Sequence, residues 1–115
     1  MLTLDGLRAY GADVDSGLAR CFNKEDFYLR LVNIGLNDPN FDRLAAAMAS
    51  GDARGAFEAA HGLKGSTGNL SLTPLSEPLI EMTDRLRDGG TVDDVAELYA
   101  RVVAALDRAR RLLEP

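Results

Sequence analysis

The segment HGLKGSTG, residues 61–68, contains the only histidine of the chain and three of its eleven glycines. A neutral imidazole is a good nucleophile toward phosphorus at physiological pH. In a helix, Lys64 lies one turn after His61, where its ammonium can reach a group attached to the ring. Gly65 and Gly68 lie one and two turns along the same face and leave it without side chains. An exposed imidazole with a cation and bare backbone beside it indicates a docking site for an anionic or phosphorylated group.

A helix over residues 52–70 turns His61 away from the protein core. On a wheel with about 100° per residue, one side collects the small and apolar residues, which are Ala56, Ala59, Ala60, Leu63, Thr67 and Leu70. Phe57 lies on the opposite, otherwise polar side, one turn before His61, and predicts an apolar contact with a partner. The residues predicted to dock that partner are Arg54, Phe57, Glu58, Gly65 and Gly68.

The chain lacks the other parts of a phosphoryl-transfer enzyme. Such transfer depends on positioning and on neutralising the phosphoryl oxygens, which one lysine and one histidine cannot achieve unaided. There is no Walker-type glycine loop, no kinase-like ATP motif and no evident carboxylate cluster for Mg²⁺. We therefore expect a phosphocarrier and not an enzyme, with no bound cofactor and with Mg²⁺ only on the partner. His61 and Cys21 are far apart in sequence and do not form a tetrahedral set, so no metal site is predicted.

Length and composition indicate one domain over residues 1–115. Apolar residues make up 46% of the chain and charged residues 27%, as is ordinary for soluble globular proteins. The net charge of −5 repels phosphate backbones, so no nucleic-acid partner is expected. No apolar run approaches the roughly 20 residues of a membrane-spanning helix, and the first residues do not resemble a signal peptide. Together with an unpaired Cys21, these features favour a cytoplasmic protein without a membrane partner.

Helix start and stop signals divide the chain into helices, and no strand pattern occurs. Short helices are predicted over residues 3–9 and 14–21, and Asn23 is predicted to cap another over 24–36. Proline and glycine signals then delimit longer helices, which cover about 39–50, 52–70, 74–88 and 92–113.

The sequence also makes predictions about how the last two of these helices begin. Thr91, with Asp94 three residues later, resembles a capping box at the start of the last helix. Pro78 complicates the preceding helix, because proline lacks the N–H that a helix interior uses. That helix either begins near Thr73 and Pro74 with an irregular first turn, or becomes regular only at Pro78.

Apolar residues at alternating steps of three and four mark one face of each of the last two helices. These stripes consist of Leu75, Leu79, Met82 and Leu86, and of Val92, Val95, Tyr99, Val102, Leu106, Ala109 and Leu113. Narrow stripes on consecutive helices fit antiparallel packing in a bundle. We therefore predict an all-α fold, an antiparallel four-helix bundle with additional short N-terminal helices that cover one end or side.

The segment AHGLKGSTGNLSL resembles the signature of histidine-containing phosphotransfer (HPt) domains, roughly H-x-L-K-G-S followed by small residues, Asn and Leu. GADVDSGLARCFNKEDFYLRLV resembles the opening segment of the family, and LIEMTDRLRDG resembles the helix after the signature. The resemblance covers nearly the whole chain. It implies a four-helix bundle and a histidine that accepts a phosphoryl group from an aspartyl phosphate and passes it to another receiver domain in a multistep phosphorelay.

The resemblance assigns roles to residues of the signature. It implies that His61 is the phosphoacceptor, that Lys64 orients the phosphate, that Gly65 is the bare position beside the ring and that Ser66 is a small packing residue. The implied partners are receiver domains of hybrid sensor kinases and response regulators, and we expect a monomer. Two positions depart from the family: Ser71, where glycine is frequent, and Pro78.

Two other readings of the sequence remain open. The first is a phosphoacceptor domain of the chemotaxis-kinase type, which a separate ATP-binding domain phosphorylates. The second is a helical interaction module whose histidine is never phosphorylated, since folds are reused without their sites.

Overall fold

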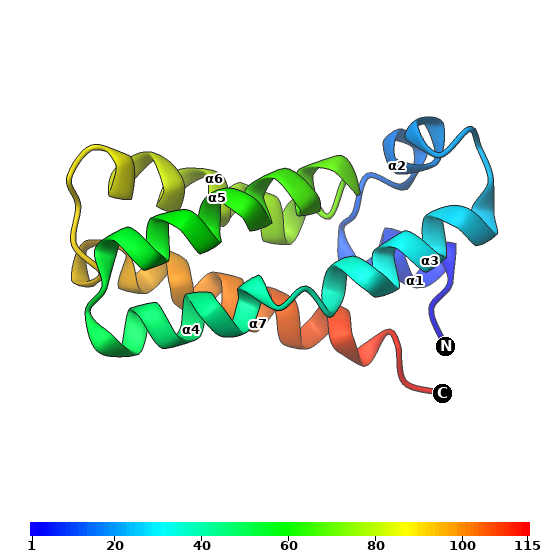
Figure 1. Cartoon of the computed structure of the whole chain (residues 1–115). Helices are drawn as coiled ribbons and strands as arrows, with labels where there is room; N and C mark the ends of the chain where they lie inside the picture. Colours follow the sequence, from blue (N-terminus) through cyan, green and yellow to red (C-terminus); the bar gives the residue numbers. More distant parts are fainter.

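Helices make up the fold, and the computed structural model describes all 115 residues. In chain order they are α1 (Leu4–Tyr10), α2 (Val14–Arg20), α3 (Glu25–Leu36), α4 (Asn40–Ser50), α5 (Ala53–Asn69), α6 (Thr73–Arg87), a 3₁₀ turn (Asp93–Val95) and α7 (Ala96–Arg111) (Figure 1). The predicted all-α fold is confirmed, and the predicted helices differ from these by only a few residues at their ends.

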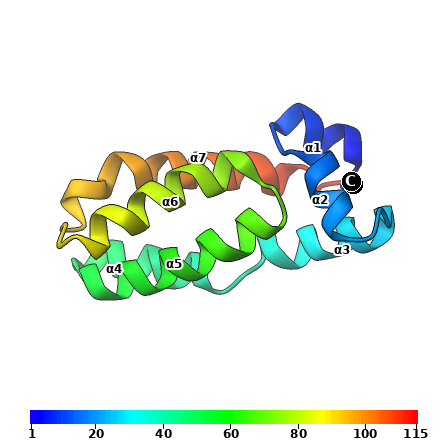
Figure 2. The same cartoon turned by 90° about the horizontal axis from the view of Figure 1, so that it is seen from above.

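The last four helices form an antiparallel bundle. α5 packs against α4 on one side and α6 on the other, and α6 also packs against α7. The three N-terminal helices lie together at one end of this bundle, close to both chain termini (Figures 1 and 2). The molecule therefore has an elongated shape, with extents of 40 × 26 × 20 Å.

The predicted apolar stripes form the core of the bundle. Leu75, Leu79 and Met82 of α6 are completely buried, and Leu86 is nearly so. Along the last helix, Val95, Val102, Leu106 and Ala109 are buried, whereas Val92, Tyr99 and Leu113 pack at the edge of the core and stay partly exposed. Burial of such side chains contributes roughly 1.5–3 kcal/mol each and holds the helices together.

Local side-chain capping occurs at the start of α5 and at the 3₁₀ turn that leads into α7. The Asp52 carboxylate accepts a hydrogen bond of 2.9 Å from the Gly55 N–H, so α5 begins at Ala53. Asp94 accepts from the Thr91 N–H at 2.8 Å, while the Thr91 hydroxyl accepts from the Asp94 N–H at 3.3 Å. This reciprocal pair confirms the predicted capping box, although the first turn after it is 3₁₀. The same backbone hydrogen bond lowers the pKa of the Asp94 carboxyl.

The prediction that Asn23 caps α3 is wrong. Lys24 holds the cap position without a side-chain hydrogen bond. Asn23 instead adopts a φ of 57°, as does Phe22 before it. Asparagine tolerates the left-handed conformation better than most residues, and here it serves the turn between α2 and α3.

Of the two predicted starts of α6, the one at Pro78 is wrong. The helix is continuous from Thr73, with Pro74 in its first turn and Pro78 buried in its interior. Proline inside a helix costs about 3 kcal/mol, because one backbone hydrogen bond is missing. Leu75 and Leu79 flank Pro78 and are fully buried, and their burial offsets a cost of that size.

Buried tyrosines attach the N-terminal helices to the bundle. The Tyr10 hydroxyl donates to the carbonyl of Ala105 in α7 at 2.9 Å, and the Tyr28 hydroxyl donates to the carbonyl of Leu70 at 2.8 Å. Gly17 gives the Tyr28 ring room, because a Cβ at Gly17 would lie 2.5 Å from that ring. The second tyrosine reaches the turn after α5, the helix that carries His61.

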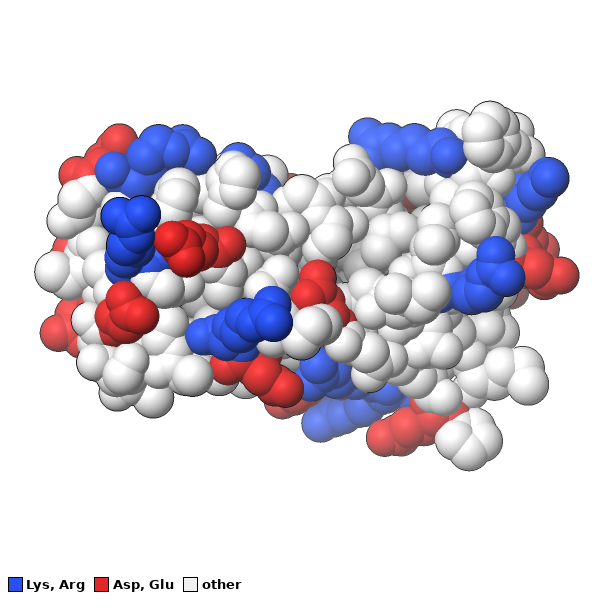
Figure 3. All heavy atoms as spheres, in the orientation of Figure 1, with Lys and Arg blue, Asp and Glu red and all other residues white.

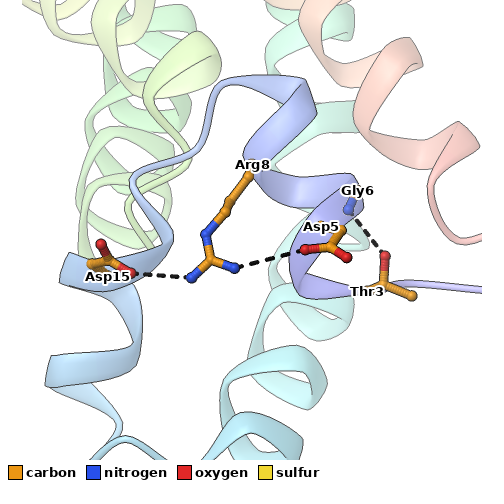
Figure 4. A network of polar contacts seen from close by, with 5 residues as sticks. All are labelled: Thr3, Asp5, Gly6, Arg8 and Asp15. Atoms are coloured by element: carbon orange, nitrogen blue, oxygen red, sulfur yellow. Dashed lines mark hydrogen bonds and ion pairs between the residues drawn. The ribbon is translucent and has the colours of Figure 1, made fainter.

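Exposed contacts also join α1 to α2. The Arg8 guanidinium lies 3.1 Å from the Asp15 carboxylate and 3.8 Å from that of Asp5, and the Thr3 hydroxyl caps α1 by accepting from the Gly6 N–H (Figure 4). Ion pairs this exposed contribute at most about 1 kcal/mol. The buried tyrosine contacts therefore do more to hold this end of the molecule.

Candidate functional site

The helix that carries His61 is oriented by its small residues. Ala56, Ala60 and Leu63 of α5 are completely buried, and Ala59, Thr67 and Leu70 are nearly so. Alanine at three of these positions lets α5 approach its neighbours α4 and α6 closely. His61 lies on the opposite, exposed side, as the helical wheel predicts. It has no hydrogen-bond or ion-pair partner within the chain.

Lys64 has no counter-charge within the chain. It lies one turn after His61, is partly buried, and belongs to none of the ion pairs of the structure. Its ammonium is therefore free to meet an anion from outside the chain. A positive charge here can balance a negative group attached to His61.

Gly65 and Gly68 leave the face beyond His61 open. A Cβ built on either residue meets no atom within 4 Å, and neither has a positive φ. The space-filling view shows an area without charged side chains near the middle of this face of the molecule, between charged groups on either side (Figure 3). Neither a close contact nor a positive φ therefore requires glycine at either position.

Gly62 has a different surrounding. A Cβ there would lie 3.0 Å from the Asn40 side-chain nitrogen at the start of α4. The absence of a side chain at Gly62 therefore lets α4 and α5 approach each other. The structure assigns this glycine a packing role, which the helical wheel alone leaves open.

Phe57 is less exposed than predicted for a docking residue. Its ring is half-buried and packs against the core. It also stacks on the His61 ring, with a centroid separation of 5.7 Å and an interplanar angle of 27°. The Arg87 guanidinium of α6 lies 5.7 Å from the centroid of the Phe57 ring. Phe57 thus connects His61 to the neighbouring helix.

The remaining predicted docking residues pair with each other. Arg54 and Glu58, one turn apart, form an ion pair of 3.3 Å with strongly exposed side chains. Both lie toward the N-terminal end of the His61 face. Any partner that uses either charge has to compete with this exposed, weak pair.

Two arginines of this region were not among the sequence-predicted residues. Arg87 reaches Phe57 from α6, and Arg20 of α2 donates a 2.7 Å hydrogen bond to the carbonyl of Gly68. A helical wheel of α5 cannot find them, because they come from other helices. In the sequence, the only feature that could indicate Arg87 is its position as a cation in the last turn of the predicted helix. No local sequence feature indicates Arg20.

No metal centre accompanies the site. The structure contains no group of three or more His, Cys, Asp or Glu side chains placed to hold a metal ion. No helix has both the length and the apolar composition needed to span a bilayer.

The fold and the site together define a class: helical-bundle proteins that display one imidazole on the outer face of a bundle helix. The family model for the Hpt domain matches residues 37–112, so the chain belongs to the Hpt domain family. Comparison with curated proteins and with solved structures gave no match. Hpt domains serve histidine phosphotransfer in phosphorelays, where they interact with receiver domains and carry phosphoryl groups without acting as catalysts.

Proposed function

We propose that this protein relays a phosphoryl group between receiver domains, with His61 as the phosphoacceptor. The observation that carries the proposal is that the only imidazole of the chain stands exposed, on a face kept bare by Gly65 and Gly68, within the residues that match the family. The receivers are those of a hybrid sensor kinase and of a response regulator, and the protein acts as a cytoplasmic monomer of one domain.

The proposed transfer is a displacement at phosphorus. A ring nitrogen of His61 attacks the phosphorus of an aspartyl phosphate on the receiver and forms a P–N bond with its lone pair. The bond from phosphorus to the aspartate oxygen breaks, and the carboxylate leaves with that electron pair. Transfer to the next receiver is the same exchange in reverse.

The chain contributes position and one charge to this reaction. Lys64 is placed to balance the phosphoryl oxygens, and α5 holds the imidazole where a receiver can approach. In this proposal the receiver contributes the remaining acidic site with its Mg²⁺. The proposed docking surface comprises Arg54, Phe57, Glu58, Gly65 and Gly68.

Incubation with a phosphorylated receiver tests the proposal. The wild-type protein should acquire an acid-labile label at His61, and His61→Gln should retain its helicity and acquire none. Lys64→Ala should slow the transfer with little change in thermal stability, whereas Lys24→Ala, which removes the only other lysine, should transfer normally.

The same assay separates the other readings. An acid-labile label on His61→Gln would contradict the assignment of the phosphoacceptor. A wild-type protein labelled only by a chemotaxis-type kinase core with ATP would indicate the kinase-fed class. Absence of label from receivers, from such a kinase core and from phosphoramidate would indicate an interaction module.

A further inference from the structure

The orientation of the His61 ring depends on one contact. The imidazole has no hydrogen-bond partner, and the residues after it on its face include the bare Gly65 and Gly68. Exposed side chains change rotamer on the picosecond to nanosecond scale. The Phe57 ring, stacked on His61 at 5.7 Å and 27°, is the group that restricts this motion. Such a separation lies within the range of attractive offset stacking.

Phe57 is itself held from the side opposite to solvent. Its ring packs against the core, and the Arg87 guanidinium lies 5.7 Å from the ring centroid. Arg87 also forms an ion pair of 3.1 Å with Asp84, one turn earlier on α6. The contacts therefore form a chain from α6 through Phe57 to His61.

Attack on phosphorus is sensitive to ring orientation. The reacting nitrogen has to lie about 3–3.5 Å from phosphorus, in line with the leaving oxygen. An imidazole that samples several rotamers meets this requirement for only part of the time. A stacked ring is already oriented before the donor arrives.

We propose that Phe57 is a positioning residue, which acts by stacking on His61 and holding the imidazole in the orientation for attack, with Arg87 supporting the Phe57 ring from α6. This inference rests on the proposed function of His61. It differs from the docking role predicted for Phe57, because positioning concerns the phosphoacceptor itself and applies to any donor.

The two roles lead to different kinetics. Loss of a docking contact raises the receiver concentration needed for half-maximal rate and leaves both the maximal rate and the reaction with phosphoramidate unchanged. Loss of positioning lowers the maximal rate with the receiver and also the rate with phosphoramidate, which is too small to need the docking surface.

The experiment compares Phe57→Leu with Phe57→Tyr in the full-length protein. Leucine keeps most of the apolar packing but has no ring, and tyrosine restores the ring. We expect Phe57→Leu to lower both rates by about tenfold, because even a small misplacement of the reacting groups can slow a reaction by this factor or more. Phe57→Tyr should restore both rates to near the wild-type values. Because His61 is the only histidine, its ring-proton NMR signals are unambiguous, and their ring-current shifts should disappear in Phe57→Leu and persist in Phe57→Tyr.

Arginine variants provide a second test that leaves Phe57 and its packing in place. Arg87→Ala should reduce the ring-current shifts and slow both reactions. Arg85→Ala is the matched control, because Arg85 lies on the same helix with an ion pair to Glu81 and no aromatic contact. It should change neither measurement.

Two results would overturn the proposal. One is a normal rate of Phe57→Leu with phosphoramidate together with a raised half-saturating receiver concentration, which assigns Phe57 to docking alone. The other is the absence of ring-current shifts in the wild-type protein. Failure of the wild-type protein to accept phosphate from any donor would instead refute the proposed function, and the NMR signals would still show whether the stack exists.

Discussion

Three glycines follow His61 within seven residues, and they differ in what surrounds them. Gly62 faces Asn40 of α4, whereas Gly65 and Gly68 face open space. Glycine in a helix interior costs roughly 0.5–1 kcal/mol relative to alanine. At Gly65 and Gly68 no contact within the fold offsets this cost, as we expect if the proposed docking of a receiver requires a face without side chains.

Substitution of these glycines should separate stability from function. Gly68→Ala should raise the free energy of unfolding by about 0.5–1 kcal/mol, since its backbone is helical and a Cβ meets no neighbour. Gly65→Gln should also fold, but should accept phosphate from a receiver much more slowly than wild type, because a long side chain stands beside the approach to His61. Thermal melts and transfer assays measure the two effects.

Phosphoramidate and Gly62→Ala are the controls for this prediction. The small donor should react with Gly65→Gln at close to the normal rate. Gly62→Ala should gain less stability than Gly68→Ala, because its Cβ would lie 3.0 Å from the Asn40 side chain. A normal receiver rate for Gly65→Gln, or unfolding of both Gly65→Gln and Gly68→Ala, would contradict the explanation.

The positions of the candidate site residues along α5 could be predicted, but their neighbours could not. A helical wheel places His61 opposite Ala56, Ala60 and Leu63 from periodicity alone. It contains no information about other helices, so the guanidinium of Arg87 over Phe57 was not foreseen. For the same reason it placed Phe57 among exposed residues, although the ring is half-buried against the core.

At the scale of elements, helix boundaries were predictable where a local side chain sets them. Asp52 and the Thr91–Asp94 pair act within four residues, and both are visible in the sequence. The prediction for Asn23 is wrong because this residue lies in an exposed left-handed turn, in which its N–H donates to the carbonyl of Leu18. The predicted start at Pro78 is wrong because Pro78 is buried inside α6, where packing between helices outweighs the local preference. Burial of Leu75 and Leu79 offsets the cost of Pro78, so α6 stays continuous, and no local sequence pattern predicts this burial.

Ser71, between α5 and α6, makes an element-scale prediction possible. Its φ is 58°, and its carbonyl accepts a hydrogen bond from the Asp13 N–H, so the turn also contacts the N-terminal helices. The left-handed conformation costs an L-residue roughly 1–2 kcal/mol, which exceeds the 0.5–1 kcal/mol that glycine loses in entropy. Ser71→Gly should therefore increase the free energy of unfolding by about 0.5–1 kcal/mol in urea titrations.

The matched control for Ser71→Gly is Gly51→Ala, which introduces a side chain at a left-handed position in another turn. Gly51 has a φ of 73°, and a Cβ there meets no atom within 4 Å. Gly51→Ala should therefore destabilise the protein through backbone strain alone. Equal stability of wild type and Ser71→Gly would show that contacts of the serine side chain offset the strain.

At the scale of the whole molecule, the N-terminal helices and the bundle are joined by contacts between distant residues. The hydroxyl of Tyr10 and its acceptor Ala105 are 95 residues apart, and Tyr28 and Leu70 are 42 apart. The sequence indicates that the short helices cover one end or side of the bundle. It cannot name these pairs, because hydrogen bonds to backbone carbonyls leave no pattern in the accepting residue.

Alkaline pH should weaken the hydrogen bonds that Tyr10 and Tyr28 donate between the N-terminal helices and the bundle. Burial raises the pKa of Tyr10 to about 12, although the nearby Arg108 acts in the opposite direction, and burial is also the main cause that raises the pKa of Tyr28 to about 12. In the unfolded chain tyrosine titrates near pH 10. Because the folded state holds these protons more tightly, their contribution to stability is fully present below pH 10 and is lost as the pH rises from 10 to 12.

Urea unfolding followed by circular dichroism between pH 8 and pH 12 measures this loss. Tyr28→Phe should be less stable than wild type at pH 8 by about 1 kcal/mol, because the hydrogen bond to Leu70 is gone. Its stability should then fall less between pH 10 and pH 12, since one buried phenol no longer ionises. Tyr99→Phe is the control, because Tyr99 is only partly buried and donates no hydrogen bond within the chain. Removal of the Tyr99 hydroxyl should therefore change the pH dependence of the unfolding free energy less than removal of the Tyr28 hydroxyl. An unfolding free energy that stays constant from pH 8 to pH 12 in the wild-type protein would contradict the role assigned to the two buried tyrosines.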